Sequence, residues 1–166
     1  RNLASYSYED RTNYLTRLDY GNGDHVKYEY DQQGRVTTQE YLNENNSLTG
    51  SLAYAYDNNG NLAKITNSAT NGWDIYYYDL TDRLVKTSSK HNGSTYSVEF
   101  KYNKDNNLTT LREGFPGYTR ETSYTYDKDN RLTKMYGYGD STRYAYDSYG
   151  RMSTRTTTGH SPTLTE

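Results

Sequence analysis

Short runs of aspartate and asparagine recur along the chain and are the residues best suited to bind a metal ion. Asp57-Asn58-Asn59-Gly60 and Asp127-Lys128-Asp129-Asn130 are two examples. A calcium loop also needs a full set of alternating oxygen ligands and a later bidentate glutamate, and these runs lack both. Asp and Asn side chains also start turns by accepting backbone N–H bonds. We therefore interpret the runs as turns and predict no metal site and no cofactor.

The three histidines are the other candidates for acid–base or metal chemistry. His25, His91 and His160 all lie near turn residues and recur at no fixed place. The sequence has no Ser-His-Asp pattern with a local signature and no glycine-rich phosphate loop. We interpret the histidines as solvated loop residues and predict that the chain is not an enzyme. A hydrolase would need an acidic pair in a cleft, and the sequence predicts no such cleft.

Aromatic side chains could instead bind sugars. Trp73 is the only tryptophan and shortly precedes the run Tyr76-Tyr77-Tyr78. In this one unit the chain resembles the aromatic cell-wall-binding repeats that bind choline or glycans. Alternation along a strand points Tyr77 away from its two neighbours. Trp73 and Tyr77 are therefore a candidate glycan platform, and a tryptophan packed over a hairpin turn is the alternative.

The elements that position these residues follow from a phrase that occurs six times. The phrase has nine positions. It begins with an aromatic residue, any residue, a Tyr, and then Asp or Asn. Two loop residues and a turn former follow, and it ends with Arg or Asn and then an aliphatic residue. The copies are Tyr28 to Val36, Tyr54 to Leu62, Tyr76 to Leu84, Phe100 to Leu108, Tyr124 to Leu132 and Tyr144 to Met152. A looser copy from Tyr6 to Leu15 is one residue longer. A period of 20 to 26 residues indicates stacked supersecondary units.

Each copy predicts a β-hairpin with a three-residue loop. Tyr54-Ala55-Tyr56 alternates as a strand does, and Asn58-Asn59-Gly60 would form the loop. Such loops end in a left-handed residue, a conformation that Gly adopts freely and Asn or Asp adopts next most readily. The residues at this turn position are Gly34, Gly60, Asp82, Asn106, Asn130 and Gly150.

The loop length also sets the register, which places the second tyrosine of each copy opposite the aliphatic residue. These pairs would form a structural ladder that stabilises one face of the sheet. The ladder tyrosines are Tyr30, Tyr56, Tyr78, Tyr102, Tyr126 and Tyr146, and the aliphatic residues are Val36, Leu62, Leu84, Leu108, Leu132 and Met152.

The composition fits a core made of tyrosine. A mean hydropathy of -1.21 alone would suggest disorder, but 22 tyrosines can bury their rings while the hydroxyls stay paired or wet. The net charge of -2 is evenly spread, so no nucleic-acid partner is expected. No apolar run reaches membrane-spanning length, so no membrane insertion is expected. Because the sequence starts at Arg1 without Met, we expect a piece of a longer protein.

These patterns predict an all-β fold in which tandem hairpins form a continuous, twisted antiparallel sheet or a superhelical β-strip. Residues 1–155 would hold about seven hairpin units, and residues 156–166 would be a disordered tail. A single-layer strip exposes aromatic surface and open edges. We therefore expect self-association, or a curl that covers the tyrosine row.

The phrase Tyr-x-Tyr-Asp-x-x-Gly-Arg-Leu is similar to the YD repeat of the RHS family, and Tyr28 to Val36 and Tyr144 to Met152 match it nearly letter for letter. The resemblance covers about residues 6–155. The family includes bacterial polymorphic toxins, cocoon subunits of insecticidal toxin complexes, and teneurins. In it, the repeats build a strip that spirals into a hollow shell around a toxic C-terminal domain, or an extracellular scaffold.

The resemblance implies a non-catalytic wall segment of such a shell or stalk, from a secreted or surface-associated bacterial toxin-delivery protein. Its partners would be the rest of the parent shell and the toxin domain. The chain departs from the family pattern because it has only seven units and lacks the core segment and toxin domain that follow the repeats. The alternative is a carbohydrate- or cell-wall-binding repeat module with a glycan as partner.

Overall fold

The protein is built from short antiparallel strands. The computed structural model describes residues 3–159, and this range contains strands and turns but no helix. Consequently, no helix in the described range could span a membrane. The strands are β1 Ala4–Tyr8, β2 Leu15–Tyr20, β3 His25–Tyr30, β4 Val36–Leu42, β5 Leu48–Tyr56, β6 Leu62–Asn67, β7 Gly72–Tyr78, β8 Leu84–His91, β9 Ser94–Tyr102, β10 Leu108–Phe115, β11 Tyr118–Tyr126, β12 Leu132–Gly137, β13 Asp140–Tyr146 and β14 Met152–Thr158.

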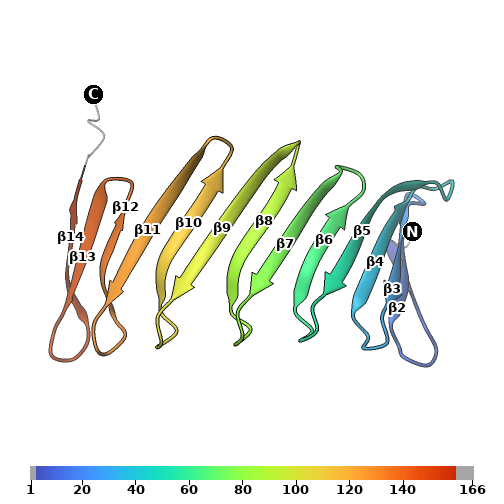
Figure 1. Ribbon diagram of the computed structural model, residues 1–166. Coiled ribbons are helices and arrows are strands. Elements are labelled where there is room, and N and C mark those ends of the chain that lie inside the picture. Colours follow the sequence, from blue (N-terminus) through green and yellow to red (C-terminus); the bar gives the residue numbers. More distant parts are fainter. Residues whose placement is uncertain (1–2, 160–166) are drawn as a thin grey trace. The chain divides into compact units, whose positions relative to one another are not determined.

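The strands follow one another in the sheet in the order in which they occur in the chain, from β1 to β14 (Figure 1). Each hairpin therefore pairs with the next through a short link. This arrangement confirms the predicted all-β fold of tandem hairpins in a continuous antiparallel sheet.

The hairpin loops have the geometry that the repeated phrase predicts. In the hairpin of β5 and β6, the N–H of Gly60 donates to the carbonyl of Asp57, and the N–H of Asp57 donates to the carbonyl of Asn61. The register shifts by one residue at Tyr56, which pairs with Leu62. A three-residue loop followed by a bulge explains both features.

All six residues at the predicted turn position have positive φ. The values range from 58° at Asp82 to 93° at Gly60. Glycine occupies three of these positions, and Asp or Asn, which tolerate this region best among the other residues, occupy the other three. The loop of the first, longer copy has Asn13 at φ 56°.

The two faces of the sheet differ in exposure. The six ladder tyrosines are half-buried, whereas the six residues that precede them, Glu29, Ala55, Tyr77, Lys101, Thr125 and Ala145, are all exposed. Few side chains are fully covered, and the buried hydrophobic residues are Val26 and Leu42. The fold is thus stabilised mainly by contacts between neighbouring strands on one face.

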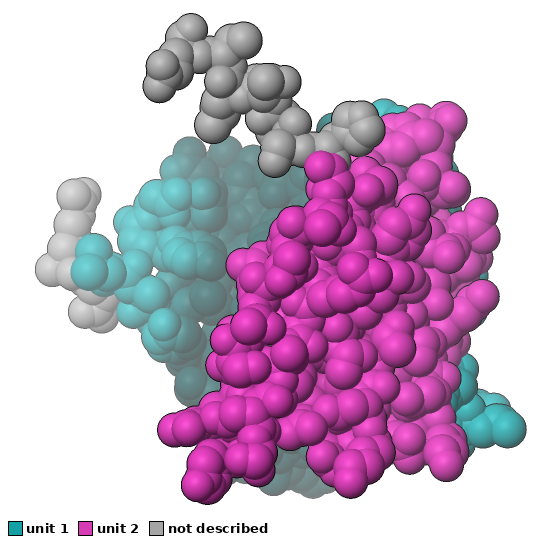
Figure 2. Space-filling view, turned by 90° about the vertical axis from the view of Figure 1, so that its left-hand side faces the viewer, with its two compact units in different colours: residues 1–83, 88–95 teal, residues 84–87, 96–166 magenta. Residues whose placement is uncertain are grey.

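The described chain divides into two compact units, which Figure 2 shows in different colours. The first comprises residues 1–83 and 88–95, and the second comprises residues 84–87 and 96–166. The same hairpin and the same link are repeated inside each unit.

The last strand extends further than the sequence analysis expected. β14 includes Thr156, Thr157 and Thr158, which we had assigned to the tail, and Thr157 pairs with Thr142 of β13. Threonine favours strands because its branched side chain fits a pleated surface. The rest of the expected tail, residues 160–166, lies outside the described residues.

Candidate functional site: the joint between repeats

The ladder tyrosines connect each repeat to the one before it. In each of the six copies the hydroxyl of the second tyrosine donates a hydrogen bond to a backbone carbonyl of the preceding repeat, at 2.8 to 3.0 Å. The acceptors are the carbonyls of Leu15, Val36, Leu62, Leu84, Leu108 and Leu132. We call this contact, together with the turn contacts described next, the inter-repeat joint.

Removal of one hydroxyl tests the joint with the smallest change. Tyr126→Phe deletes the donor that lies 2.9 Å from the carbonyl oxygen of Leu108. We expect the free energy of unfolding to fall by about 1 kcal/mol, because the half-buried carbonyl loses its partner. Tyr149→Phe is the matched control, since this tyrosine is 82% exposed and should give no change. Equal urea midpoints for the two variants would contradict the joint.

The residue after the turn position forms the second part of the joint. The guanidinium of Arg35 lies over the ring of Tyr56, 4.2 Å from its centroid, and that of Arg131 lies 4.8 Å from the ring centroid of Tyr146. Each guanidinium also approaches the turn of the next repeat. A Cβ atom added to Gly60 would lie 3.5 Å from Nη1 of Arg35. In these two joints the arginine thus faces a turn that has no side chain.

Where asparagine replaces arginine, the partner changes as well. The side-chain amide of Asn61 donates to Oδ1 of Asp82 at 2.7 Å, and that of Asn107 donates to Oδ1 of Asn130 at 2.7 Å. The shorter asparagine is therefore matched by a turn residue that carries an acceptor. Sequence reasoning missed this relation, because we considered the turn residues only for their backbone conformation.

In five of the six copies the residue before the loop is an aspartate, and this aspartate organises its own turn. Oδ1 of Asp79 accepts hydrogen bonds from the N–H groups of Thr81 and Arg83, and Oδ2 accepts one from the side chain of Arg83 at 2.7 Å. The Arg83 side chain, followed by the Thr81 hydroxyl, holds the pKa of Asp79 far below its ordinary value. The runs of Asp and Asn are therefore turn residues in the structure. Among the described residues, no group of three or more His, Cys, Asp or Glu is placed to hold a metal ion.

These aspartates predict a loss of stability in acid. Their pKa values are lower in the folded state than in the unfolded state. Their contribution to the free energy of unfolding is therefore complete above the unfolded-state pKa, about 3.9, and is lost as the pH falls through the lower folded-state pKa. Asp79→Asn should lower stability at pH 7 but reduce the further loss between pH 4 and pH 2. Asp105→Asn is the control, because that side chain is exposed in another loop. Parallel pH profiles for the parent and Asp79→Asn would contradict this assignment.

One predicted loop histidine is instead buried. His25 is 2% exposed, and the part of the chain that the structure describes offers no hydrogen-bond partner to either ring nitrogen. It opens β3, where it pairs with Asp19 on one side and Leu42 on the other. Our interpretation of His25 as a solvated loop residue is therefore wrong. The turn signal at Asn22-Gly23 ends before His25, which already belongs to the strand.

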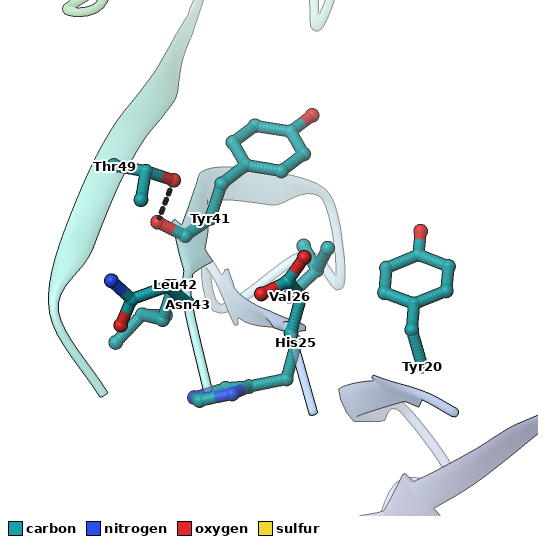
Figure 3. A pocket seen from close by; sticks show the side chains of 8 residues that line it. Tyr20, His25, Val26, Tyr41, Leu42, Asn43 and Thr49 are labelled. Atoms are coloured by element: carbon teal, nitrogen blue, oxygen red, sulfur yellow. Dashed lines mark hydrogen bonds between the residues drawn. The ribbon is translucent and has the colours of Figure 1, made fainter. Parts of the chain in front are cut away.

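A cavity of about 300 Å³ lies beside this histidine. Figure 3 shows the rings of Tyr20 and Tyr41 on one side and the ring of His25 pointing away from them. Thr49 closes one wall by donating to the carbonyl of Tyr41 at 2.9 Å. The carboxylate of Asp24 also lines this cavity, but among the described residues neither ring nitrogen of His25 has a hydrogen-bond partner.

The other two histidines add no such site. His91 ends β8 and contacts the carboxylate of Asp74 at 3.3 Å, and its side chain is 56% exposed. This pair suits a surface ion contact when the imidazole is protonated. His160 lies outside the described residues.

The candidate glycan platform is only partly exposed. Trp73 and Tyr77 both belong to β7 and point to the same face, since their positions differ by four, an even number, along the strand. Tyr77 is 45% exposed, whereas Trp73 is half-buried and pairs with Thr66 of β6. The two aromatic rings therefore share a face but differ in accessibility.

The turn between β12 and β13, in the second unit, is a feature that the sequence analysis missed. Tyr138 has φ 58°, a conformation rare for a large side chain, and Gly139 follows it at φ 84°. The Tyr138 hydroxyl donates to Glu113, and Arg120 lies 5.2 Å from its ring centroid. Tyr-Gly is not among the usual turn signals, so this link between β12 and β13 had no sequence prediction.

Comparisons with known proteins agree with the hairpin array. Residues 126–162 match the model of the RHS repeat. No curated protein matches the chain. Among solved structures, the chain resembles TcdB2-TccC3, with a TM-score of 0.61 and 16% identity over 89% of this chain and 11% of that one.

Two related structures give the same result. TcdB2-TccC3 without its hypervariable C-terminal region has a TM-score of 0.60 and 14% identity, over 95% of this chain and 11% of that chain. The Tc holotoxin pore of Photorhabdus luminescens has a TM-score of 0.61 and 15% identity, over 91% of this chain and 11% of that chain. At these identities the likeness is one of fold, and this chain spans about 11% of each of these structures. The resemblance seen in the sequence is confirmed: the chain carries an RHS repeat, also called a YD repeat, at residues 126–162.

Proposed function

We propose that this chain is a non-catalytic wall segment of a larger YD-repeat shell or stalk. The observation that supports this most directly is the hydrogen bond from the ladder tyrosine of each copy to the preceding repeat, which recurs six times. The bond links main chain to side chain at every step, so it resists separation of adjacent hairpins. A sheet built in this way can form a barrier without presenting a reactive group.

The parent in this proposal is a secreted or surface-associated bacterial toxin-delivery protein. The RHS repeat match and the fold likeness to TcdB2-TccC3 support this choice. In the family that the sequence resembles, such repeats enclose a toxic C-terminal domain. The partners of this segment are then the neighbouring repeats of the parent and, on the inner face of the wall, its toxin domain.

The full-length gene product provides the test. We expect electron microscopy to show a hollow particle whose wall includes these 166 residues. We also expect any C-terminal domain to resist protease until the wall is opened. Gly60→Val, placed in the full-length protein, should open the wall and expose that domain, while Asn59→Val should not. A full-length protein that has no further repeats and no enclosed region would refute the proposal.

A glycan-binding module is the second candidate, and the exposed ring of Tyr77 on the face of Trp73 favours it. Aromatic rings on an open face can stack against sugar rings, as in many carbohydrate-binding surfaces. The test is binding of the folded chain to a panel of glycans and cell-wall fragments. Saturable binding that Trp73→Ala abolishes would support this function, and equal binding by Tyr77→Phe would show that the ring, rather than its hydroxyl, is the platform.

A further inference from the structure

One left-handed turn position holds an unexpected residue type. Among the described residues, those other than glycine that have positive φ are asparagines and aspartates, with Tyr138 as the exception. The link between β8 and β9 has Asn92-Gly93 at the place where the link between β12 and β13 has Tyr138-Gly139. A large aromatic residue tolerates this conformation less well than asparagine does, so Tyr138 strains the turn. Backbone strain of this kind is concentrated at binding and active sites.

The ring of Tyr138 belongs to a group of aromatic side chains around Arg120. The guanidinium of this arginine lies 5.2 Å from the ring centroids of Phe115 and Tyr138, and 5.3 Å from that of Tyr118. Phe115 and Tyr118 stack on each other with their centroids 4.8 Å apart, and Tyr96 meets Phe115 edge to face at 6.5 Å. Three rings thus hold the guanidinium in place. We call Arg120 and these four aromatic residues the arginine cluster.

The arginine cluster lies on one face of the second unit. Phe115 pairs with Tyr118 across the turn between β10 and β11. Glu113 pairs with Arg120 in the same two strands, so these four side chains share a face. Tyr118 is 50% exposed and Tyr138 is 58% exposed. Each strand from β9 to β13 has a neighbour on both sides (Figure 1), so this exposure is not that of an open sheet edge.

The guanidinium of Arg120 is exposed and forms no ion pair with a carboxylate among residues 3–159. Glu113, which is its partner in the register, accepts a hydrogen bond from the Tyr138 hydroxyl instead. A guanidinium presents its N–H donors as a planar fork that matches the two oxygens of a carboxylate. The arginine cluster therefore offers a fixed positive group beside exposed aromatic rings, with no anion of its own.

We propose that the arginine cluster binds an acidic polysaccharide through a uronic acid unit. The carboxylate of the sugar accepts hydrogen bonds from the Arg120 guanidinium, and such charge-assisted pairs are the strong ones. The C–H face of the same sugar ring stacks on the exposed ring of Tyr118. Tyr138 covers the opposite side of the guanidinium and keeps it turned toward the ligand, which is the gain that offsets the strain in its turn.

Other ligands match these groups less well. A neutral glycan would leave the guanidinium without an anionic partner. An acidic side chain of a peptide has a flexible stem and little apolar surface. A uronic acid carries its carboxylate on a rigid ring, so less conformational entropy is lost on binding. The net charge of -2 disfavours a nucleic acid.

This site is separate from the features used above. Trp73 and Tyr77 belong to the first unit, whereas the arginine cluster belongs to the second, and the wall function needs no ligand. Binding of the polysaccharide without any hollow particle would support this inference while leaving the proposed function unsupported. A hollow particle that binds no polysaccharide would overturn this inference alone.

Polygalacturonate is the probe, and titration calorimetry with the folded 166-residue chain measures its dissociation constant. Methyl-esterified polygalacturonate is the matched control ligand, because it keeps the sugar ring and loses the negative charge. Arg120→Gln removes the guanidinium. Arg112→Gln is its control, since Arg112 is also exposed but alternates with Glu113 and points to the opposite face. We expect the ester and Arg120→Gln each to weaken binding about tenfold, and Arg112→Gln to leave it unchanged.

Tyr138→Asn tests the strained turn. The substitution supplies the Asn-Gly pair found in the link between β8 and β9, so the urea midpoint should not fall. The loss of the ring should weaken binding of polygalacturonate several-fold, because the guanidinium is then held on one side only. A lower urea midpoint with unchanged binding would show that Tyr138 serves only the fold and would contradict its place in the site.

Three further results would overturn the proposal. The first is no saturable binding of polygalacturonate, or equal binding of its methyl ester. The second is equal affinity of the parent and Arg120→Gln when circular dichroism shows both to be folded. The third is polyglutamate that binds as tightly as polygalacturonate, which would replace the sugar by an acidic peptide as the ligand of the arginine cluster.

Discussion

Tyr56→Ala should be the most damaging single truncation within the second hairpin, with a loss of about 3 kcal/mol in the free energy of unfolding. The substitution removes a half-buried ring, the hydroxyl that donates to the carbonyl of Val36 at 2.8 Å, and the surface on which the Arg35 guanidinium lies. Packing, hydrogen bonding and cation–π attraction are lost together, and each contributes to stability. Urea unfolding followed by circular dichroism measures the effect.

Ala55→Ser is the control for this variant. Ala55 precedes Tyr56 in the same strand but is exposed on the opposite face. A polar substitution at an exposed strand position should change stability by no more than about 0.5 kcal/mol. If Tyr56→Ala and Ala55→Ser unfold at the same urea concentration, the half-buried face does not stabilise the sheet as we describe.

Gly60→Val should cost about 2–3 kcal/mol, the second-largest effect we expect. Gly60 has φ 93°, which a β-branched residue tolerates poorly. The added Cβ atom would lie 3.5 Å from Nη1 of Arg35, which is an ordinary van der Waals contact. The strain therefore arises in the backbone of the turn.

Two comparisons test whether the left-handed turn position causes the loss in this variant. Asn59→Val places the same side chain one residue earlier in the loop, at a residue without positive φ, and should have a much smaller effect on the melting temperature. Gly60→Asn supplies the residue found at Asn106 and Asn130, so it should recover most of the lost turn stability. Equal losses for Gly60→Val and Asn59→Val would show that the left-handed turn position is misplaced.

Much of this fold could be predicted because its information is local. The alternation in Tyr54-Ala55-Tyr56, the loop residues that follow, and the left-handed preference of Gly60 all lie within a few residues of one another. Such a segment determines its own hairpin register, since a slip by one residue would turn every side chain to the other face. The order of the strands then follows from short links that leave each hairpin beside the next.

The features that we missed depend on contacts between repeats or on unusual residues. The bond between Asn61 and Asp82 joins residues that are 21 positions apart, and no local pattern reports it. Tyr138 occupies a turn position that asparagine usually takes, so its residue type gave no signal. His25 lies one residue beyond a turn-like segment, and only its neighbours in β2 and β4 show that it is buried.

The ladder hydroxyl binds a main-chain oxygen, and this has an evolutionary consequence. Every residue type has a backbone carbonyl, so the residue that accepts the bond can drift among Val36, Leu62 and other aliphatic residues without loss of the contact. Selection then needs to retain one tyrosine and one left-handed turn residue in each repeat. Such a protein can diverge widely while its architecture persists, in keeping with 14–16% identity to structures of similar fold.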